Sequence, residues 1–140
     1  MSRYPLYYAI TVANITVFPV RVKKIALTTR PNPTWNADNM PPQDGRIAIV
    51  TGGNSGIGLE TVRALARKGA TVYMASRNEA KARNALSKLR SDTETRKGHV
   101  DFLPLDLSSF ESIQRCVHLF QESQNHLDML FNCAAILEPN

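Results

Sequence analysis

The stretch that decides the fold is TGGNSGIG, residues 51–58. It follows the apolar run IAIV (residues 47–50) and precedes LETVRALARKGA (residues 59–70), whose apolar residues have helical spacing. A strand that turns through glycines into a helix points backbone amides and the positive end of the helix dipole at one spot, where a phosphate usually binds. Glycine is needed there because a Cβ would block the turn or the approach of the phosphate. The sequence therefore predicts a pyrophosphate site, with a tight turn that binds no ligand as the alternative.

The chain after residue 46 alternates short apolar runs with segments of helical spacing. Strands are predicted at residues 47–51, 70–75, 100–105 and 127–132, and the first helix at residues 56–68. In the first two helices, the predicted inward residues are Leu59, Val62, Leu65, Ala66, Ala82, Ala85, Leu86 and Leu89. Such alternation is typical of βαβ units around a parallel sheet, so the predicted fold class is α/β.

The third predicted helix begins with a capping box, Ser108-x-x-Glu111. In this motif the hydroxyl and the carboxylate satisfy amide groups that the first turn leaves free. The helical period then places four residues on the inward face, Phe110, Ile113, Val117 and Phe120.

Two regions are expected along the chain. Residues 1–45 combine an apolar leader with an irregular arm rich in Pro and Asn, and residues 46–140 form the ordered domain. Three interpretations of the leader stay open: a loosely packed or disordered segment, a weak membrane anchor through residues 4–20, and a cleaved signal. We expect a cytoplasmic location, on the cytosolic face of an intracellular membrane if the leader is an anchor.

Composition and charge exclude several classes of protein. Residues 46–140 carry 12 basic and 10 acidic groups, a near balance that does not favour nucleic-acid binding. The two cysteines, Cys116 and Cys133, form neither a disulfide framework nor a metal-ligand spacing, and we interpret both as buried small hydrophobic residues. The three histidines are scattered, so they are interpreted as surface residues and no metal site is predicted.

The end of the second predicted strand indicates which dinucleotide would bind. In folds of this kind an acidic residue there binds the ribose 2′-hydroxyl of NAD, whereas an arginine accommodates the 2′-phosphate of NADP. Residues 74–78 read Met-Ala-Ser-Arg-Asn and contain no acid. Residues 77–97 carry seven basic and three acidic groups. NADP is therefore preferred to NAD, with Arg77 as the candidate ligand, although Arg77 could instead be a solvated residue at a helix start.

These residues resemble the short-chain dehydrogenase/reductase family over about residues 40–136. The glycine motif matches the family's TGxxxGxG, Leu105-Asp106-Leu107 resembles its motif at the third strand, and Asn132-Cys133-Ala134-Ala135 resembles its NNAG motif. Cys133 and Ala135 depart from that last motif. The resemblance implies that Asp106 accepts a hydrogen bond from the adenine amino group and that Leu107 offers its backbone amide. The candidate cofactor-binding residues are Gly52, Asn54, Ser55, Gly56, Ile57, Gly58, Arg77, Asp106, Leu107, Asn132 and Ala134.

The resemblance also implies an activity, hydride transfer between a nicotinamide and an alcohol or carbonyl substrate. The sequence is most similar to retinol dehydrogenase-like members, which are commonly NADP-dependent and act on lipophilic substrates. The family's catalytic Ser and Tyr-x-x-x-Lys are absent: Tyr73 is followed four residues later by Arg77. No catalytic residue is therefore assigned, and the 140-residue chain alone is predicted to be an inactive, truncated cofactor-binding half. The alternatives are a non-catalytic dinucleotide-binding or interaction module and an incomplete gene product.

The implied architecture is a partial Rossmann-type parallel sheet of about four strands in the order 3-2-1-4. The third strand is then an outer strand, which explains why Pro104 is tolerated in it. The fourth strand would present an apolar open edge with Met129, Leu130 and Phe131, and pairing of this edge with another chain is a further expectation.

Overall fold

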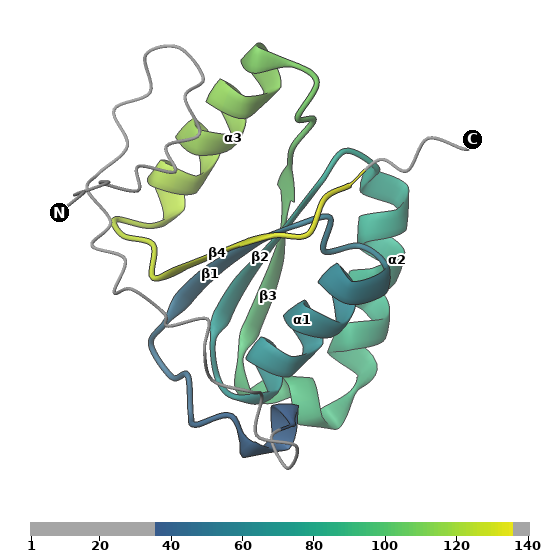
Figure 1. The fold of residues 1–140 in the computed structure, drawn as a ribbon, viewed down its shortest axis with the longest axis vertical. Helices are drawn as coiled ribbons and strands as arrows, with labels where there is room; N and C mark the ends of the chain where they lie inside the picture. Colours follow the sequence, from purple (N-terminus) through teal and green to yellow (C-terminus); the bar gives the residue numbers. More distant parts are fainter. Residues whose placement is uncertain (1–35, 136–140) are drawn as a thin grey trace, which may run out of the picture. The chain divides into compact units, whose positions relative to one another are not determined.

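A parallel sheet of four strands forms the centre of the fold (Figure 1). The structure is a computed structural model, and it describes residues 36–135. The strands lie in the order β3-β2-β1-β4, which confirms the predicted order. The elements are η1 (Ala37–Asn39), β1 (Ile47–Thr51), α1 (Gly56–Arg67), β2 (Thr71–Ser76), α2 (Glu79–Ser91), η2 (Thr93–Lys97), β3 (His99–Pro104), α3 (Phe110–Ser123) and β4 (Met129–Asn132).

Helices cover both faces of this sheet, with α1 and α2 on one face and α3 on the other (Figure 1). The side chains of Val72 and Met74 in β2 are fully buried on the α1 and α2 face, whereas Tyr73 and Ala75 belong to the core beneath α3. This alternation follows from the two-residue period of a strand. All four inward residues predicted for α2 are buried, so the sequence pattern correctly predicted the register of that helix.

The core beneath α3 includes an aromatic pair. The rings of Tyr73 and Phe120 meet edge to face, with centroids 5.2 Å apart and an interplanar angle of 82°. The Tyr73 hydroxyl accepts a hydrogen bond of 2.8 Å from the side-chain amide of Gln124, so its polar tip is satisfied. Phe120 therefore fixes α3 against the sheet.

The predicted start of α3 is wrong by one residue. Ser109 is the N-cap, and its hydroxyl accepts the Ser112 N–H at 3.2 Å. Ser108 instead bonds to the Asp106 carboxylate, so it is not available to cap the helix. Phe110 is 65% exposed, which corrects its predicted inward position, and Cys116 is buried in its place.

The two edge strands differ in how open they are to pairing. The amides of His99 and Leu105 point toward β2, so the backbone groups of Phe102 and Pro104 face outward. The Phe102 N–H is bound by the Asp101 carboxylate at 2.9 Å, and Pro104 has no N–H. The outer position of β3 confirms the explanation given for Pro104.

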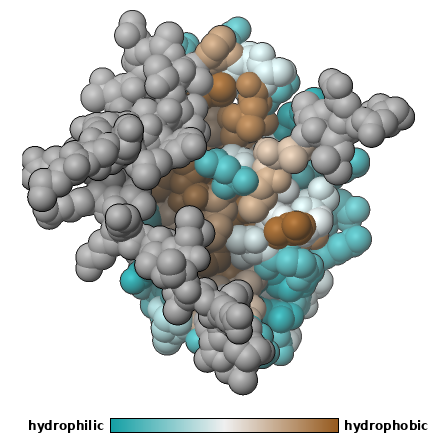
Figure 2. All heavy atoms as spheres, viewed as in Figure 1, coloured by the Kyte–Doolittle hydropathy of each residue, from teal (hydrophilic) through white to brown (hydrophobic). Residues whose placement is uncertain are grey.

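At the other edge of the sheet, β4 pairs only with β1 among the described residues. Leu130 in this strand is 49% exposed. Hydrophobic residues gather along β4 on the part of the face that the described residues cover (Figure 2).

Residues 36–45 of the predicted arm lie against the end of α1. The side chain of Asn36 caps the short helix η1, and Met40 packs against the main core. Gln43 is buried and its N–H donates to the Lys68 carbonyl at 2.6 Å, while Lys68 Nζ donates to the Asp38 carbonyl at 2.7 Å. The predictions for the leader, residues 4–20, concern residues outside the described range.

Candidate functional site

The glycine loop joins the carboxyl end of β1 to the amino end of α1 (Figure 1). Gly52 has φ 66° and Gly56 has φ 53°, values in the left-handed region that residues with a Cβ rarely adopt. The first turn of α1 leaves its leading amides without helical partners, and the side chain of the N-cap residue, Ser55, makes no capping hydrogen bond. The loop thus has donors available for an anion.

Close backbone contacts explain the glycines at positions 52 and 58. A Cβ at Gly58 would lie 2.8 Å from the carbonyl carbon of Gly52 and closer still to its oxygen. A Cβ at Gly52 would lie 2.9 Å from the Cα of Ala134, beyond β4. The loop, α1 and the end of β4 are therefore in backbone contact, and a side chain at either glycine would separate them.

Thr51 holds the end of β4 beside this loop. Its hydroxyl oxygen accepts the Ala134 N–H at 3.1 Å, and its O–H donates to the Phe131 carbonyl at 3.4 Å. Asn132 and Ala134 are exposed, while Cys133 is half-buried. The substitutions at Cys133 and Ala135 leave the close approach between Ala134 and Gly52 in place.

The end of β2 carries a residue that sequence reasoning missed. Ser76 is 7% exposed, and its hydroxyl oxygen has no hydrogen-bond partner among the described residues. It immediately precedes Arg77, which is exposed and takes part in none of the ion pairs found in residues 36–135. A buried polar group without a partner is uncommon and calls for an explanation such as a role in binding a ligand. The sequence signal was available, because Ser76 stands at the strand end where an acid was sought.

Asp106 and Leu107 follow β3 at the same edge of the sheet. The Asp106 carboxylate accepts hydrogen bonds from the Ser108 O–H at 2.7 Å and from the Ser108 N–H at 2.9 Å. These two bonds, together with the positive charge of Arg77, lower the pKa of Asp106 below its ordinary 3.8. Asp106 is therefore an ionised acceptor at neutral pH. Leu107 is 56% exposed.

The structure brings the predicted residues together at the carboxyl ends of the strands. Because all four strands are parallel, their carboxyl ends meet there, and each strand end carries part of the predicted set. An edge of this kind, with amide donors, an arginine and a carboxylate acceptor, suits an extended ligand that carries phosphate groups and a base. Two hollows of about 200 Å³ and 380 Å³ lie elsewhere, between α2 and β3, and none of the predicted site residues lines them.

The remaining histidines and cysteines differ in their burial, and Cys133, which was predicted to be buried, is half-buried. No group of three or more His, Cys, Asp or Glu side chains in residues 36–135 could hold a metal ion. The three histidines are exposed. Cys116 is buried, and its burial raises the pKa of the thiol to about 11, so it is an unreactive core residue.

Fold and site together define a Rossmann-type nucleotide-binding domain. The sequence model of the short chain dehydrogenase family matches residues 46–140, and the chain belongs to that family, as the motifs predicted. Members of this family bind a nicotinamide dinucleotide.

Similar proteins agree with this assignment. A short-chain dehydrogenase/reductase of Armillaria gallica is 44% identical over 108 residues, which are 76% of this chain and 34% of that protein. Human polyprenol dehydrogenase is 41% identical over 97 residues, 69% of this chain and 29% of that protein. The RhlG/NADP active-site complex of Pseudomonas aeruginosa has a TM-score of 0.61 and 32% identity, covering 68% of this chain and 36% of that one. The chain thus spans about a third of the length of the relatives it matches.

Proposed function

We propose that residues 46–140 form the NADP-binding part of an oxidoreductase that transfers hydride between NADP(H) and an alcohol or carbonyl compound. The observation behind this proposal lies at the end of β2, where an acid would select NAD. There a buried hydroxyl with no hydrogen-bond partner in residues 36–135 is adjacent to an exposed arginine. When bound, the cofactor would supply the hydride-carrying carbon. The chain's own residues would bind and orient it.

Most of the predicted residues, together with Ser76, would have a role in holding the dinucleotide. The amides at the start of α1, with the glycines at 52, 56 and 58, would bind the pyrophosphate. Ser76 and Arg77 would bind the 2′-phosphate through a hydroxyl and a guanidinium. The ionised Asp106 would accept from the adenine amino group, with the Leu107 amide beside it. Asn132 and Ala134 would face the nicotinamide ribose from the end of β4.

Nucleotide titration of the 140-residue chain tests the proposal. We expect NADPH to bind more tightly than NADH. Arg77→Glu should weaken NADPH binding about tenfold or more, because a hydrogen bond to a charged group contributes about 1.5–3 kcal/mol. Ser76→Asp should also weaken NADPH binding, since its carboxylate would repel the phosphate, while NADH affinity is kept or improved.

Arg115→Glu is the matched control, because Arg115 is also an exposed arginine but lies on α3 beside Glu111. It should leave the affinity for both nucleotides within about twofold. Failure of the parent chain to bind either nucleotide would overturn the proposal. Unchanged NADPH affinity in both the Arg77 and Ser76 variants would overturn the assignment of the 2′-phosphate.

Binding without turnover is the second part of the proposal. The printed sequence contains no Tyr-x-x-x-Lys pair, so nothing in it is assigned as the proton donor or acceptor of the reaction. We expect the 140-residue chain to hold NADPH without reducing a carbonyl compound. Turnover by the purified chain, lost in the Arg77→Glu variant, would contradict this expectation.

A second candidate function is a non-catalytic interaction module that pairs through β4. The exposure of Leu130 on this edge strand supports it. Sedimentation of the chain with and without Leu130→Lys tests the idea, since self-pairing through β4 would give a dimer that the substitution abolishes. A monomer at high concentration would refute pairing between copies.

Membrane contact through residues 4–20 stays a prediction. Among the residues that the structure describes, no helix is both long enough and apolar enough to cross a bilayer.

A further inference from the structure

Helix α2 carries positive charges that form no ion pair with any acidic side chain of the described residues. Lys81, Lys88 and Arg90 are exposed, as is Lys97 after the helix. None of these four forms an ion pair with the described part of the chain. In contrast, Arg63 and Arg67 on α1 and Arg115 on α3 each have a carboxylate within 3.4 Å.

Three acids near α2 are bound to arginines, and a fourth, Asp101, lines the hollow on the β3 side of the helix. Glu79 pairs with Arg83 on the same helix. Asp92 lies 3.1 Å from Arg63 and 3.3 Å from Arg67, both on α1. Glu94 also contacts Arg67, at 3.1 Å. The field of the three paired acids is therefore largely cancelled, and the positive field of α2 is not.

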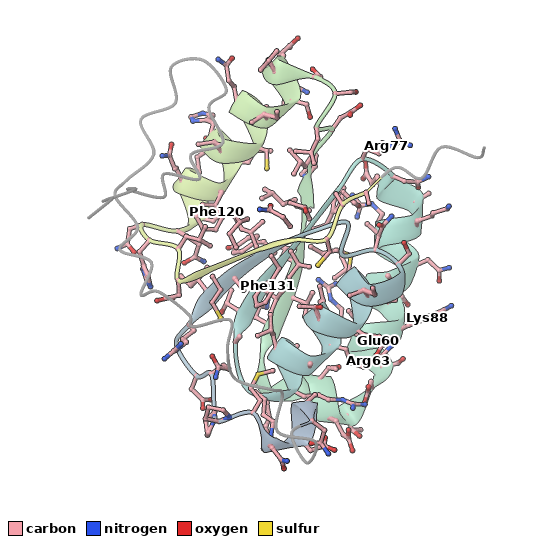
Figure 3. The ribbon with its side chains drawn as sticks, in the orientation of Figure 1. Glu60, Arg63, Arg77, Lys88, Phe120 and Phe131 are labelled. Carbon is pink, nitrogen blue, oxygen red and sulfur yellow. The ribbon has the colours of Figure 1, made fainter. Side chains whose placement is uncertain are left out.

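Two of these charges, Lys81 and Lys88, lie along one side of the helix that starts at the proposed 2′-phosphate site. Lys81 and Lys88 are seven residues apart and share a helix face. Arg77 lies at the upper end of α2, and Lys88 lies lower on its outer side (Figure 3). At 1.5 Å per residue, Lys88 is about 16 Å from Arg77, too far to touch a phosphate bound there.

We propose that the unpaired lysines of α2, Lys81 and Lys88, steer NADP(H) electrostatically to its site and favour it over NAD(H) through the association rate. This inference rests on the proposed function. The 2′-phosphate adds about 1.5–2 negative charges at neutral pH, so a positive field acts more strongly on NADPH than on NADH. A positive surface of this kind raises the rate at which an anionic ligand meets its site.

The expected size follows from Coulomb's law with salt screening. For Lys88→Glu, the charge changes by two units about 16 Å from a phosphate that carries about two charges. The Debye length is about 30 Å at 0.01 M salt and about 8 Å at 0.15 M. The association rate constant of NADPH should therefore fall about threefold at 0.01 M salt and only about 1.3-fold at 0.15 M.

Stopped-flow mixing of the 140-residue chain with NADPH, followed by nucleotide fluorescence, tests the inference. Lys88→Gln should produce about half of the Lys88→Glu effect on the logarithm of the rate constant, and Lys88→Arg none. Lys81→Glu should have a larger effect that persists at 0.15 M salt, because residue 81 is closer to Arg77. The dissociation rate should change less than the association rate in the Lys88 variants, and NADH should show a smaller effect throughout.

Three results would overturn the inference. The first is an unchanged association rate at 0.01 M salt in folded Lys88→Glu, which would leave the proposed NADP site intact. The second is an effect on dissociation alone, which would indicate a contact rather than steering. The third is a parent chain that does not bind NADPH, which would overturn the proposed function together with this inference.

Discussion

Replacing Gly58 by alanine tests whether the glycine loop depends on backbone contact between α1 and the end of β1. A Cβ at residue 58 would lie 2.8 Å from the carbonyl carbon of Gly52 and 3.1 Å from the Cα of Gly53. Both neighbours are backbone atoms, which cannot rotate away as a side chain can. The start of α1 must therefore move from the loop. Overpacking of this kind costs about 1–3 kcal/mol. Because 1 kcal/mol shifts the Tm of a domain of this size by about 4–8 °C, we expect Tm to fall by at least about 4 °C.

The same movement should weaken nucleotide binding. The amides at the start of α1 would no longer point at the position of the pyrophosphate, and hydrogen bonds weaken steeply with poor alignment. We expect Gly58→Ala to lose at least about tenfold in NADPH affinity, or about 1.4 kcal/mol, measured by calorimetric titration at a temperature well below the variant's Tm.

Gly45→Ala is the matched control for backbone strain. Gly45 has φ 74°, and a Cβ at this residue would meet no atom within 4 Å. The residue precedes the amino end of β1, whereas the glycine loop follows its carboxyl end. Alanine in this left-handed conformation costs about 1–2 kcal/mol. The Tm of Gly45→Ala should therefore fall about as much as the Tm of Gly58→Ala, while NADPH affinity stays unchanged. A folded Gly58→Ala protein that binds NADPH as tightly as the parent would refute the reasoning.

Three further predictions test the fold around the site. Thr51→Val removes the hydroxyl that accepts the Ala134 N–H, so the free energies of unfolding and of NADPH binding should each weaken by about 1 kcal/mol, whereas Thr51→Ser should retain both; equal losses in the two variants would contradict the role of the hydroxyl. Phe120→Ala should reduce the free energy of unfolding in urea by about 3–5 kcal/mol, and Phe110→Ala by less than about 0.5 kcal/mol; similar losses would contradict the observed face of α3. A backbone amide hydrogen bond, followed by two arginine side chains, holds the pKa of Asp92 below 3.8, so stability that is present above pH 3.8 should be lost as the pH falls below it. In Asp92→Asn, the free energy of unfolding in urea should fall less steeply as the pH is lowered. The same pH dependence in the variant and the parent would refute the contribution of Asp92.

Hydrophobic periodicity predicted the sheet and two helices well because their buried residues form regular patterns. All five residues of the predicted strand 47–51 form β1, and the four predicted inward residues of α2 are buried. A run covered on both faces, or a stripe with a regular period, leaves little freedom for another register.

Two adjacent serines explain the error at α3. Ser108 and Ser109 can each cap a helix, and local sequence does not distinguish them. The choice depends on Asp106, whose carboxylate binds Ser108. Phe110 is therefore the first residue of the helix and is 65% exposed, whereas Phe120, on the same predicted face, is buried.

Ser76 shows what motifs alone do not reveal about the site. Its residue type is ordinary, and only the structure shows that its hydroxyl is buried without a partner among the described residues. The bond between Thr51 and Ala134 joins residues 83 apart in the sequence, a contact that no local pattern can predict.

The contacts that hold the site are also contacts that hold the fold. Gly52 approaches Ala134, and Thr51 binds it, only when β4 is paired with β1. The nucleotide should therefore bind the folded chain and not the unfolded one, which stabilises the fold by about 2.7 kcal/mol at a concentration of 100 times Kd. A variant that keeps its Tm but loses the nucleotide-dependent rise in Tm has lost the site alone. A variant with a lower Tm and no nucleotide-dependent rise in Tm has lost the β1–β4 contact on which the site depends.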